Sequence, residues 1–324
     1  MPGLALAWHK LHRRTKWLAE LLGLKLIHMP EPPPYIRSAL RTIGVLCGKP
    51  GLVLVQGTHG PLLFLAASLK RLMGYTLVVD AHSGMFIPFG WKSYLLTLPF
   101  RGFLKRADLV ILHEPTIAEE AVRGLALGPG KALVLYDPPP PGALGPVGTP
   151  EGGPEGPRPL KLIFPSGGLA DEPIRELVEV VNGYGGQVEL IITGPHEPRR
   201  EGKAFFTGYL PYGEYLGLLR SSDAVLALTK LEYTVLGACW EALYYAKPLI
   251  TSRTKALRRI FGRAAIYIRG PEELPDVLRK LETEPGLLGE KAKLMEELRG
   301  KILAEHEHQV RALLSLLASL RRPR

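Results

Sequence analysis

The sequence predicts an α/β protein built from two doubly wound parallel-sheet domains. Apolar runs of strand length alternate with amphipathic helical segments along the whole chain. The runs are apolar on both faces, as in parallel sheets that helices cover on both sides. A segment rich in proline and glycine divides this alternation into two similar halves. Strand–helix alternation repeated in two blocks is typical of paired Rossmann-like domains.

In the first half, continuous runs such as TLVVD predict buried strands, and the segments between them have helical spacing. Two of the helical patterns cover residues 12–22 and 61–73. The predicted strands are residues 24–29, 52–56, 76–80, 109–113 and 132–136.

The second half repeats this scheme. Within residues 205–210 (FFTGYL), residues 207–209 are expected to form a loop before a helix that starts near Pro211, and residues 287–320 have helical spacing throughout. The predicted strands are residues 160–164, 188–193, 224–229, 248–252 and 265–268.

Residues 137–159 (DPPPPGALGPVGTPEGGPEGPRP) contain nine Pro and six Gly and have no apolar periodicity. Such a composition predicts an exposed linker or a long loop. The predicted organisation is an N-terminal domain at 1–137, a linker at 138–159, a C-terminal domain at 160–300 and a C-terminal helix at 301–324.

The composition, 46% hydrophobic and 22% charged residues, is that of a soluble globular protein. No run reaches the roughly 18 apolar residues that a membrane span needs, and residues 4–8 are too short for a signal peptide. Cys47 and Cys239 provide neither a disulfide framework nor a zinc-binding spacing. We therefore expect a cytoplasmic protein. One Asn and three Gln indicate either a thermophilic source or GC-rich coding.

The net charge of +10 is concentrated in the first half, where residues 1–137 carry 16 Lys/Arg against 8 Asp/Glu. This surplus indicates an anionic partner, namely a membrane surface, a phosphorylated substrate or nucleic acid, or else a solvated basic face without a specific partner. Residues 86–106 mix aromatic and basic side chains, which suits either a helix at the level of lipid headgroups or a core helix with basic ends.

In the second half, small and polar residues follow the predicted strands, where ligands of parallel sheets bind. Ser166 and Gly167 open the loop after the first of these strands, and Gly194 ends the next. Such turns let a phosphate approach the backbone, although plain tight turns have the same composition. Gly208 and Tyr209 belong to the predicted loop that is suited to hold a nucleobase.

Residues 230–252 (KLEYTVLGACWEALYYAKPLITS) are the most informative segment, since a helix is expected to begin near Leu236. Thr234, Val235, Leu236 and Gly237 would then present main-chain N–H groups to a diphosphate. Glu241, one turn further, can accept hydrogen bonds from the two ribose hydroxyls, or can simply cap or solvate the helix.

This segment resembles the donor-binding signature of GT-B glycosyltransferases related to family 4, of the bacterial group 1 type. The matching residues are 232–242 (EYTVLGACWEA), with eight residues between Glu232 and Glu241 where the wider family more often has seven. Residues 171–173 (DEP) and 80–84 (DAHSG) also fit this bacterial branch. The resemblance spans nearly the whole chain and implies a GT-B fold, in which two Rossmann-like domains face a cleft.

The resemblance also implies a function, the transfer of a hexosyl group from a nucleotide diphosphate sugar to a cell-surface polysaccharide or lipid-linked glycan acceptor. Glu241 would hold the ribose. The donor-binding residues that we predict are Ser166, Gly167, Gly194, Gly208, Tyr209, Glu232, Tyr233, Thr234, Val235, Leu236, Gly237 and Glu241.

In the first half, Asp80 and His82 follow a predicted strand and are the predicted catalytic residues. In similar enzymes this position carries an Asp or His that acts as general base or contacts the donor sugar. Further candidates are His59, His113 and Glu114.

The sequence departs from the family pattern because residues 166–173 lack the Arg and Lys that usually neutralise the leaving diphosphate. Main-chain N–H groups, Lys230 or Arg253 would have to replace them. We expect metal-independent transfer and no cofactor besides the nucleotide-sugar co-substrate.

A nucleotide-sugar epimerase and a catalytically silent partner subunit of the same fold remain alternatives. We do not expect nucleic acid as a partner, because no basic helix or aromatic-studded strand is offered to a groove. Peripheral contact with an anionic membrane would place the protein at the inner face of the cytoplasmic membrane.

Overall fold

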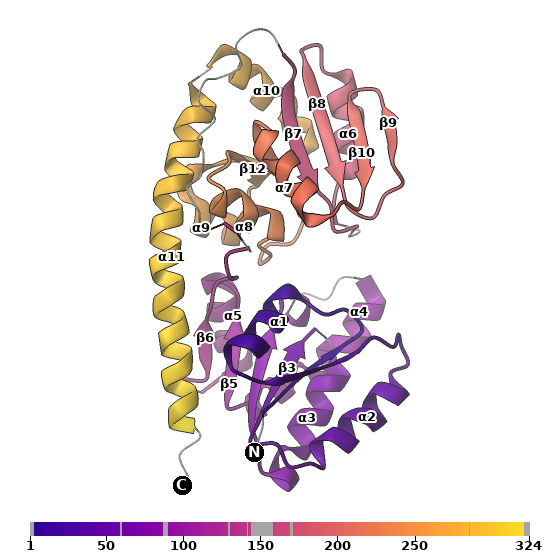
Figure 1. The fold of residues 1–324 in the computed structure, drawn as a ribbon, viewed down its shortest axis with the longest axis vertical. Helices are drawn as coiled ribbons and strands as arrows, with labels where there is room; N and C mark the ends of the chain where they lie inside the picture. The colour runs from indigo at the N-terminus through magenta and orange to yellow at the C-terminus, as the bar shows by residue number, and fades with distance from the viewer. Residues whose placement is uncertain are drawn as a thin grey trace. The chain divides into compact units, whose positions relative to one another are not determined.

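The computed structural model describes residues 3–58, 60–86, 90–128, 130–140, 142–143, 158–168, 171–284 and 286–320 (Figure 1). The chain forms two compact units, Met1–Pro138 with Glu305–Arg324, and Pro139–Ala304. The predicted division differs at the C-terminal end, where it set residues 301–324 apart as a separate helix. The last turns join the first unit because Leu313 and Leu317 pack into its core.

The first unit contains a six-stranded parallel sheet of order β2-β1-β3-β4-β5-β6. We did not predict β1, because residues 4–8 (LALAW) were considered only as a signal peptide, although they form a continuous apolar run of strand length. All five are buried between β2 and β3, so tertiary pairing defines this strand. The strands are β1 (Leu4–Trp8), β2 (Lys25–Met29), β3 (Leu52–Gly57), β4 (Thr76–Ala81), β5 (Leu109–Leu112) and β6 (Ala132–Val134).

Helices cover both faces of this sheet. On one face, alternate strand residues such as Leu54 and Val78 pack with Leu18 of α1 (Arg13–Leu21) and with the end of α11 (Leu287–Leu320). Elsewhere α3 packs on β3 and β4, and α5 packs on β5 and β6. The remaining elements are α2 (Ile36–Leu46), α3 (Gly60–Met73), η1 (Ser83–Met85), α4 (Gly90–Thr97), η2 (Leu98–Arg106) and α5 (Pro115–Leu125).

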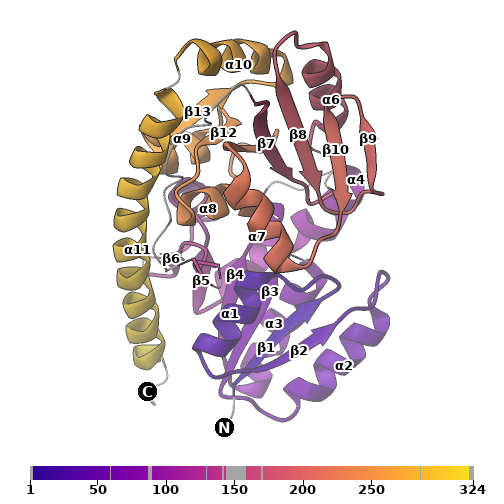
Figure 2. The ribbon, with the colours of Figure 1, turned by 45° about the horizontal axis from the view of Figure 1, so that its top comes forward.

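The second unit contains a seven-stranded sheet of order β13-β12-β11-β7-β8-β10-β9, parallel except for the edge strand β9 (Figure 2). The expected loop at residues 207–209 is wrong for Thr207 and Gly208. Residues Ala204–Gly208 form β10, which pairs with both β8 and β9. The strands are β7 (Leu160–Pro165), β8 (Val188–Thr193), β9 (Arg199–Glu201), β10 (Ala204–Gly208), β11 (Ala224–Ala227), β12 (Leu249–Ser252) and β13 (Ala265–Ile268).

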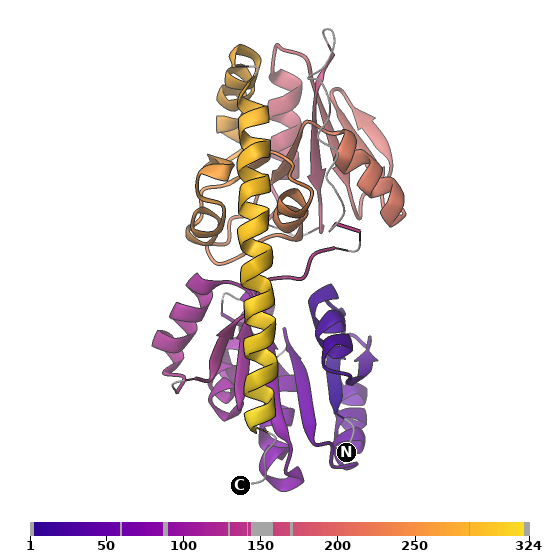
Figure 3. The same cartoon turned by 60° about the vertical axis from the view of Figure 1, so that its left-hand side comes forward.

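The core of the second unit joins strand residues such as Leu190 and Leu226 to Leu177 and Leu278 on helices. Helix α11 is continuous over its 34 residues and supplies residues to both units (Figure 3). The helices are α6 (Ile174–Gly183), α7 (Tyr212–Ser221), α8 (Gly237–Tyr244), α9 (Lys255–Phe261), α10 (Leu274–Thr283) and α11, with short η3 (Gly262–Ala264) and η4 (Pro271–Glu273). Among the described residues, no helix has the length and apolar character to cross a bilayer.

The strand order of the second sheet reverses between β7 and β11. From β7 the chain adds β8 and β10 on one side, and it then adds β11, β12 and β13 on the other. At such a reversal the two neighbouring strand–helix loops diverge and leave a crevice beyond the carboxyl ends of the strands. The topology therefore selects the loops after β7 and β11 as the place for a ligand.

Helix α8 gives a test of this core. It is buried nearly all round, and the Trp240 ring is 0% exposed and lies between the rings of Tyr244 and Phe261. We expect Trp240→Ala to lower the unfolding free energy of the second unit by about 3–5 kcal/mol, because it removes a large buried side chain. Denaturant titration measures this. The Tyr209→Ala control removes an aromatic ring that is 79% exposed and should change stability by less than about 0.5 kcal/mol.

Candidate functional site

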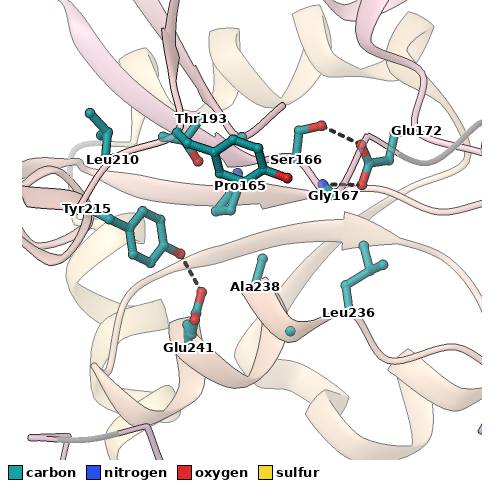
Figure 4. A pocket seen from close by; sticks show the side chains of 13 residues that line it. Pro165, Ser166, Gly167, Glu172, Thr193, Leu210, Tyr215, Leu236, Ala238 and Glu241 are labelled. Atoms are coloured by element: carbon teal, nitrogen blue, oxygen red, sulfur yellow. Dashed lines mark hydrogen bonds between the residues drawn. The ribbon is translucent and has the colours of Figure 1, made fainter. Parts of the chain in front are cut away.

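A cavity of about 340 Å³ lies in the second unit, beyond the carboxyl ends of β7 and β8 and against the start of α8 (Figure 4). It therefore occupies the crevice that the strand order predicts. The residues that line it are Pro165, Ser166, Gly167, Glu172, Thr193, Gly194, Tyr209, Leu210, Tyr215, Leu236, Gly237, Ala238 and Glu241.

The N-terminal end of α8 forms one wall of this cavity. Leu236 is the N-cap in extended conformation, and the helix runs from Gly237 to Tyr244. As the first two helical residues, Gly237 and Ala238 have N–H groups that no carbonyl within the helix can reach. The helix dipole adds partial positive charge at this end. This wall therefore suits an anionic or hydrogen-bond-accepting group.

Glu241 lies one turn further along α8 and is held in place by α7. The Tyr215 hydroxyl donates a hydrogen bond to Glu241 Oε2, across 26 residues of sequence (Figure 4). The carboxylate is partly exposed and lines the cavity. Tyr215 thus orients one carboxylate oxygen, which restricts how the side chain can present itself to a ligand.

A second carboxylate, Glu172, fills the loop after β7. Its oxygens accept hydrogen bonds from the Ser166 hydroxyl at 2.6 Å, the Gly167 N–H at 2.8 Å and the Gly168 N–H at 3.1 Å. Figure 4 shows this group at one side of the cavity and the Tyr215–Glu241 pair at the other. Consecutive backbone N–H groups form a natural anion site. Here the chain supplies the anion itself.

The neighbouring Asp171 has a structural role. It is 2% exposed, and it accepts a 2.6 Å hydrogen bond from Thr229 Oγ1 just beyond β11. The Thr229 N–H in turn bonds Ser252 Oγ on β12. Pro173 then occupies the N-cap position of α6. The DEP motif therefore ties three strand ends together through Asp171 and points Glu172 into the loop.

Gly194 permits the close packing of two strand ends at the cavity. Its φ is +110°, and a Cβ there would lie 2.1 Å from the Ser166 carbonyl oxygen. Any side chain would have to displace the backbone of the loop after β7. Only glycine at position 194 thus allows this packing of the strand ends beneath the cavity.

The cavity has an unusual charge balance. Its lining contains two carboxylates, Glu172 and Glu241, and no Lys, Arg or His. Lys230 and Arg253, the two cations expected to replace the missing pair, are exposed and do not line it. His196 contacts a lining residue from outside, with Nε2 2.9 Å from Ser166 Oγ. Within the described ranges, no three His, Cys, Asp or Glu side chains cluster in a way that could hold a metal ion.

The structure brings seven of the twelve predicted donor residues to this cavity. They are Ser166, Gly167, Gly194, Tyr209, Leu236, Gly237 and Glu241. Glu232 lies elsewhere and helps to cap α9, because its Oε2 accepts from the Lys255 N–H at 2.9 Å. The expected free N–H at Thr234 is wrong, since this group bonds the Leu231 carbonyl at 3.4 Å. The others outside the lining are Gly208, Tyr233 and Val235.

Sequence reasoning did not place Glu172 or Tyr215 among the site residues. A signal for Glu172 existed, because a carboxylate five positions after a strand-end Gly can fold back onto its N–H groups. Tyr215 offered no comparable signal, since its pairing with Glu241 depends on how α7 and α8 pack. The remaining lining residues that were not predicted are Pro165, Thr193, Leu210 and Ala238.

In the first unit, Asp80 is an anchor rather than an accessible carboxylate. It is 0% exposed, and its oxygens contact Arg14 Nε at 2.8 Å, Thr15 Oγ1 at 2.8 Å and His82 Nε2 at 3.2 Å. Burial alone would raise the pKa of Asp80, but the Arg14 guanidinium, with His82 and Thr15, holds it well below the usual aspartate range. Direct contact of Asp80 with a substrate is excluded in this conformation.

His82 is the accessible member of this pair. Its side chain is 18% exposed, and its ring lies 4.4 Å from that of His12. Its Nε2 lies 3.2 Å from Asp80 Oδ2, so of the two residues that we predict to be catalytic, Asp80 is buried and His82 is accessible. Of the other candidates, Glu114 is buried and caps α5 through the N–H groups of Thr116 and Ile117. His113 is 8% exposed, and His59 lies outside the described residues.

Comparisons with known proteins agree with this architecture. Residues 172–315 match the family model described as glycosyl transferase-like. The chain is similar to Anabaena HepE in complex with UDP and glucose, with a TM-score of 0.72 and 13% identity over 97% of this chain and 100% of that one. No curated protein matches it in sequence.

Two further solved structures cover almost the whole chain. Sucrose-phosphate synthase from Thermosynechococcus elongatus has a TM-score of 0.70 and 12% identity over 99% of both chains. WaaG, a glycosyltransferase involved in lipopolysaccharide biosynthesis, has a TM-score of 0.67 and 12% identity over 93% of this chain and 95% of that one. The fold is GT-B. The predicted fold class is thereby confirmed.

The buried ion pair of the first unit can be tested by stability. We expect Arg14→Met to lower the unfolding free energy by about 3–5 kcal/mol at neutral pH, because Asp80 keeps its charge without its cation. The exposed neighbour Arg13→Met is the control. Because the folded pKa of Asp80 is lowered, the wild type keeps this contribution above the unfolded value of about 3.9 and loses it only as the pH falls through the folded value.

In Arg14→Met the pKa of Asp80 should rise. The difference in unfolding free energy between this variant and the wild type should therefore shrink as the pH falls from 7 toward 4. Denaturant titrations across this range measure both effects. Equal stability of the two variants would refute the assignment of Asp80 as an anchor.

Proposed function

We propose that this protein is a glycosyltransferase that moves a sugar from a nucleotide diphosphate sugar to an acceptor hydroxyl. The observation that carries the proposal is the single cavity where the Glu241 carboxylate and the N-terminal amides of α8 lie together at the switch point of a parallel sheet. The glycosyl transferase-like match over residues 172–315 and the UDP-bound HepE structure support it.

In this proposal the cavity holds the nucleoside diphosphate. The Glu241 carboxylate accepts hydrogen bonds from the ribose hydroxyls, and Tyr215 keeps its second oxygen in place. The N–H groups of Gly237 and Ala238 hold the diphosphate at the positive end of α8. Tyr209 and Leu210, directly after β10, border the space for the base.

The reaction breaks the bond between the anomeric carbon and the diphosphate oxygen and forms a bond from that carbon to the acceptor oxygen. The acceptor proton passes to a base, and the diphosphate leaves with the electron pair. Backbone amides would stabilise this charge, since no cation lines the described cavity. Transfer without a metal ion belongs to the proposal, and activity that persists in the presence of EDTA would support it.

On the acceptor side we assign the chemistry to His82, with Asp80 as its positioning residue. His82 would take the acceptor proton if the enzyme inverts configuration, or would hold the sugar if it retains configuration. Hexosyl transfer to a cell-surface polysaccharide or a lipid-linked glycan is the reaction we propose, within the relationship to family 4.

A catalytically silent partner subunit is the second candidate. It is favoured by the two carboxylates and the missing cation in the cavity, since such a site can bind a nucleoside but stabilises a leaving diphosphate poorly. Nucleotide binding without hydrolysis or transfer would select this alternative.

The donor assignment is tested by thermal shift with UDP, GDP, ADP and UDP-glucose. We expect at least one nucleotide to raise the melting temperature of the wild type and to lose this effect in Glu241→Ala, because the ribose contact is removed.

Glu214→Ala is the matched control, as this carboxylate lies on α7 but does not line the cavity. Absence of any stabilisation, or equal stabilisation of wild type and Glu241→Ala, contradicts the proposal.

For Glu172 we predict the opposite effect, namely that a substitution strengthens nucleotide binding. Its charge opposes a diphosphate in the same cavity, so we expect Glu172→Gln to bind the stabilising nucleoside diphosphate several-fold more tightly. The amide oxygen of Gln can still accept from the Gly167 N–H, so the loop should keep its shape.

Isothermal titration calorimetry of wild type, Glu172→Gln and Glu214→Gln measures this. Binding weaker than in the wild type would show that the Glu172 charge assists the ligand instead of opposing it.

A further inference from the structure

Helix α2 in the first unit buries polar side chains and exposes apolar ones, which is the opposite of an ordinary amphipathic helix. Its polar residues Ser38 and Thr42 are both 0% exposed, whereas Ile36 and Leu40 are 64% and 66% exposed and Ile43 is 37% exposed. The three apolar residues follow the spacing i, i+4, i+7 and so form one stripe. A helix on a globular protein normally buries such a stripe.

Specific hydrogen bonds hold α2 in this orientation. Ser38 Oγ donates to Glu31 Oε2 at 2.9 Å, while Thr42 Oγ1 accepts from Trp8 Nε1 at 3.1 Å. Turning the helix to bury its apolar stripe would leave these buried polar groups without partners, which is costly. The exposure of the stripe is therefore built into the fold.

Helices α3 and α4 of the same unit also expose apolar side chains. Helix α3 packs against α2, α4 and η2, and α2 and α3 run side by side (Figures 1 and 2). Helix α4 exposes Trp91 (70%) and Tyr94 (52%), and α3 exposes Leu72 (75%). We call the exposed side chains of α2, α3 and α4 the α2–α4 face. Trp91 and Tyr94 come from residues 86–106, the segment that suits either a helix at the level of lipid headgroups or a core helix with basic ends.

The chain around this face is depleted of negative charge. Residues 32–107 contain nine Lys or Arg and one carboxylate, which is the fully buried Asp80. Arg37 and Arg41 are exposed on α2, each one position after a residue of the apolar stripe. One of the nine, Lys70, is neutralised by Asp108 at 2.6 Å, and the Glu31 carboxylate just before this range interacts electrostatically with Arg37 and Arg41. The face as a whole is apolar with a cationic border.

This pattern selects one kind of partner. A second copy of the chain would bring two cationic borders together, which opposes association through this face. Anionic phospholipids match both the charge and the exposed Trp and Tyr, which favour the bilayer interface.

We propose that the α2–α4 face docks the protein on an anionic bilayer, with α2 lying in the headgroup layer. The inference specifies the peripheral membrane contact that the sequence suggests, and it requires neither donor binding nor sugar transfer.

The test is co-sedimentation of the full chain with vesicles of phosphatidylcholine and phosphatidylglycerol, against vesicles of phosphatidylcholine alone. We expect binding to the mixed vesicles that weakens with added salt. The triple variant Ile36→Ser/Leu40→Ser/Ile43→Ser should bind about tenfold or more weakly. Leu314→Ser, which removes an exposed leucine from α11, is the control and should bind like the wild type.

A charge variant keeps the test valid if the triple variant folds poorly. Arg37→Glu/Arg41→Glu leaves the apolar stripe intact and should also lose about tenfold or more in affinity for the mixed vesicles. The control Arg311→Glu changes an exposed charge on α11.

Equal binding of wild type and both α2 variants, or no vesicle binding by the wild type, overturns the proposal. So does a dimer that the triple variant dissociates, because the face would then bind a second copy. Nucleotide thermal shifts of the α2 variants should match those of the wild type, so failure of the donor site and failure of this face are separable.

Discussion

Parallel strand pairing is the constraint on which the candidate site depends. In a parallel sheet every strand ends at the same edge, so residues that follow different strands meet although the chain separates them widely. Ser166 after β7, Thr193 at the end of β8 and Glu241 on the helix after β11 share one cavity for this reason. The reversal of strand order between β7 and β11 then keeps the crevice between their loops open.

The electrostatics of this cavity differ from a simple anion site. The loop after β7 has the N–H groups to hold an anion, yet Glu172 already occupies them. Free N–H groups remain available at the start of α8, where Gly237 and Ala238 line the same cavity. Glu241 adds a second carboxylate that is suited to hydroxyl groups. The arrangement favours a polyhydroxylated ligand whose charge is held by backbone dipoles.

In the first unit, hydrogen bonds between buried polar groups determine which side chains are exposed at the surface. Arg14 neutralises Asp80 inside the unit and leaves His82 at the surface. Trp8 and Glu31 similarly satisfy Thr42 and Ser38, and so keep the polar side of α2 inward. In both places a hydrogen-bonded interior fixes which side chains face outward, since unpaired polar groups are costly to bury.

The sequence by itself determined the two-domain α/β architecture, because apolar runs of strand length record burial on both faces of a sheet directly. It also indicated Ser166, Gly194 and Glu241, since strand ends and helix starts are local features. The structure alone decided the pairing of Tyr215 with Glu241 and the capping role of Glu232. Tertiary contacts likewise defined β10 and the outward turn of the α2 stripe. Each of these depends on partners distant in sequence, and local pattern carries no information about such partners.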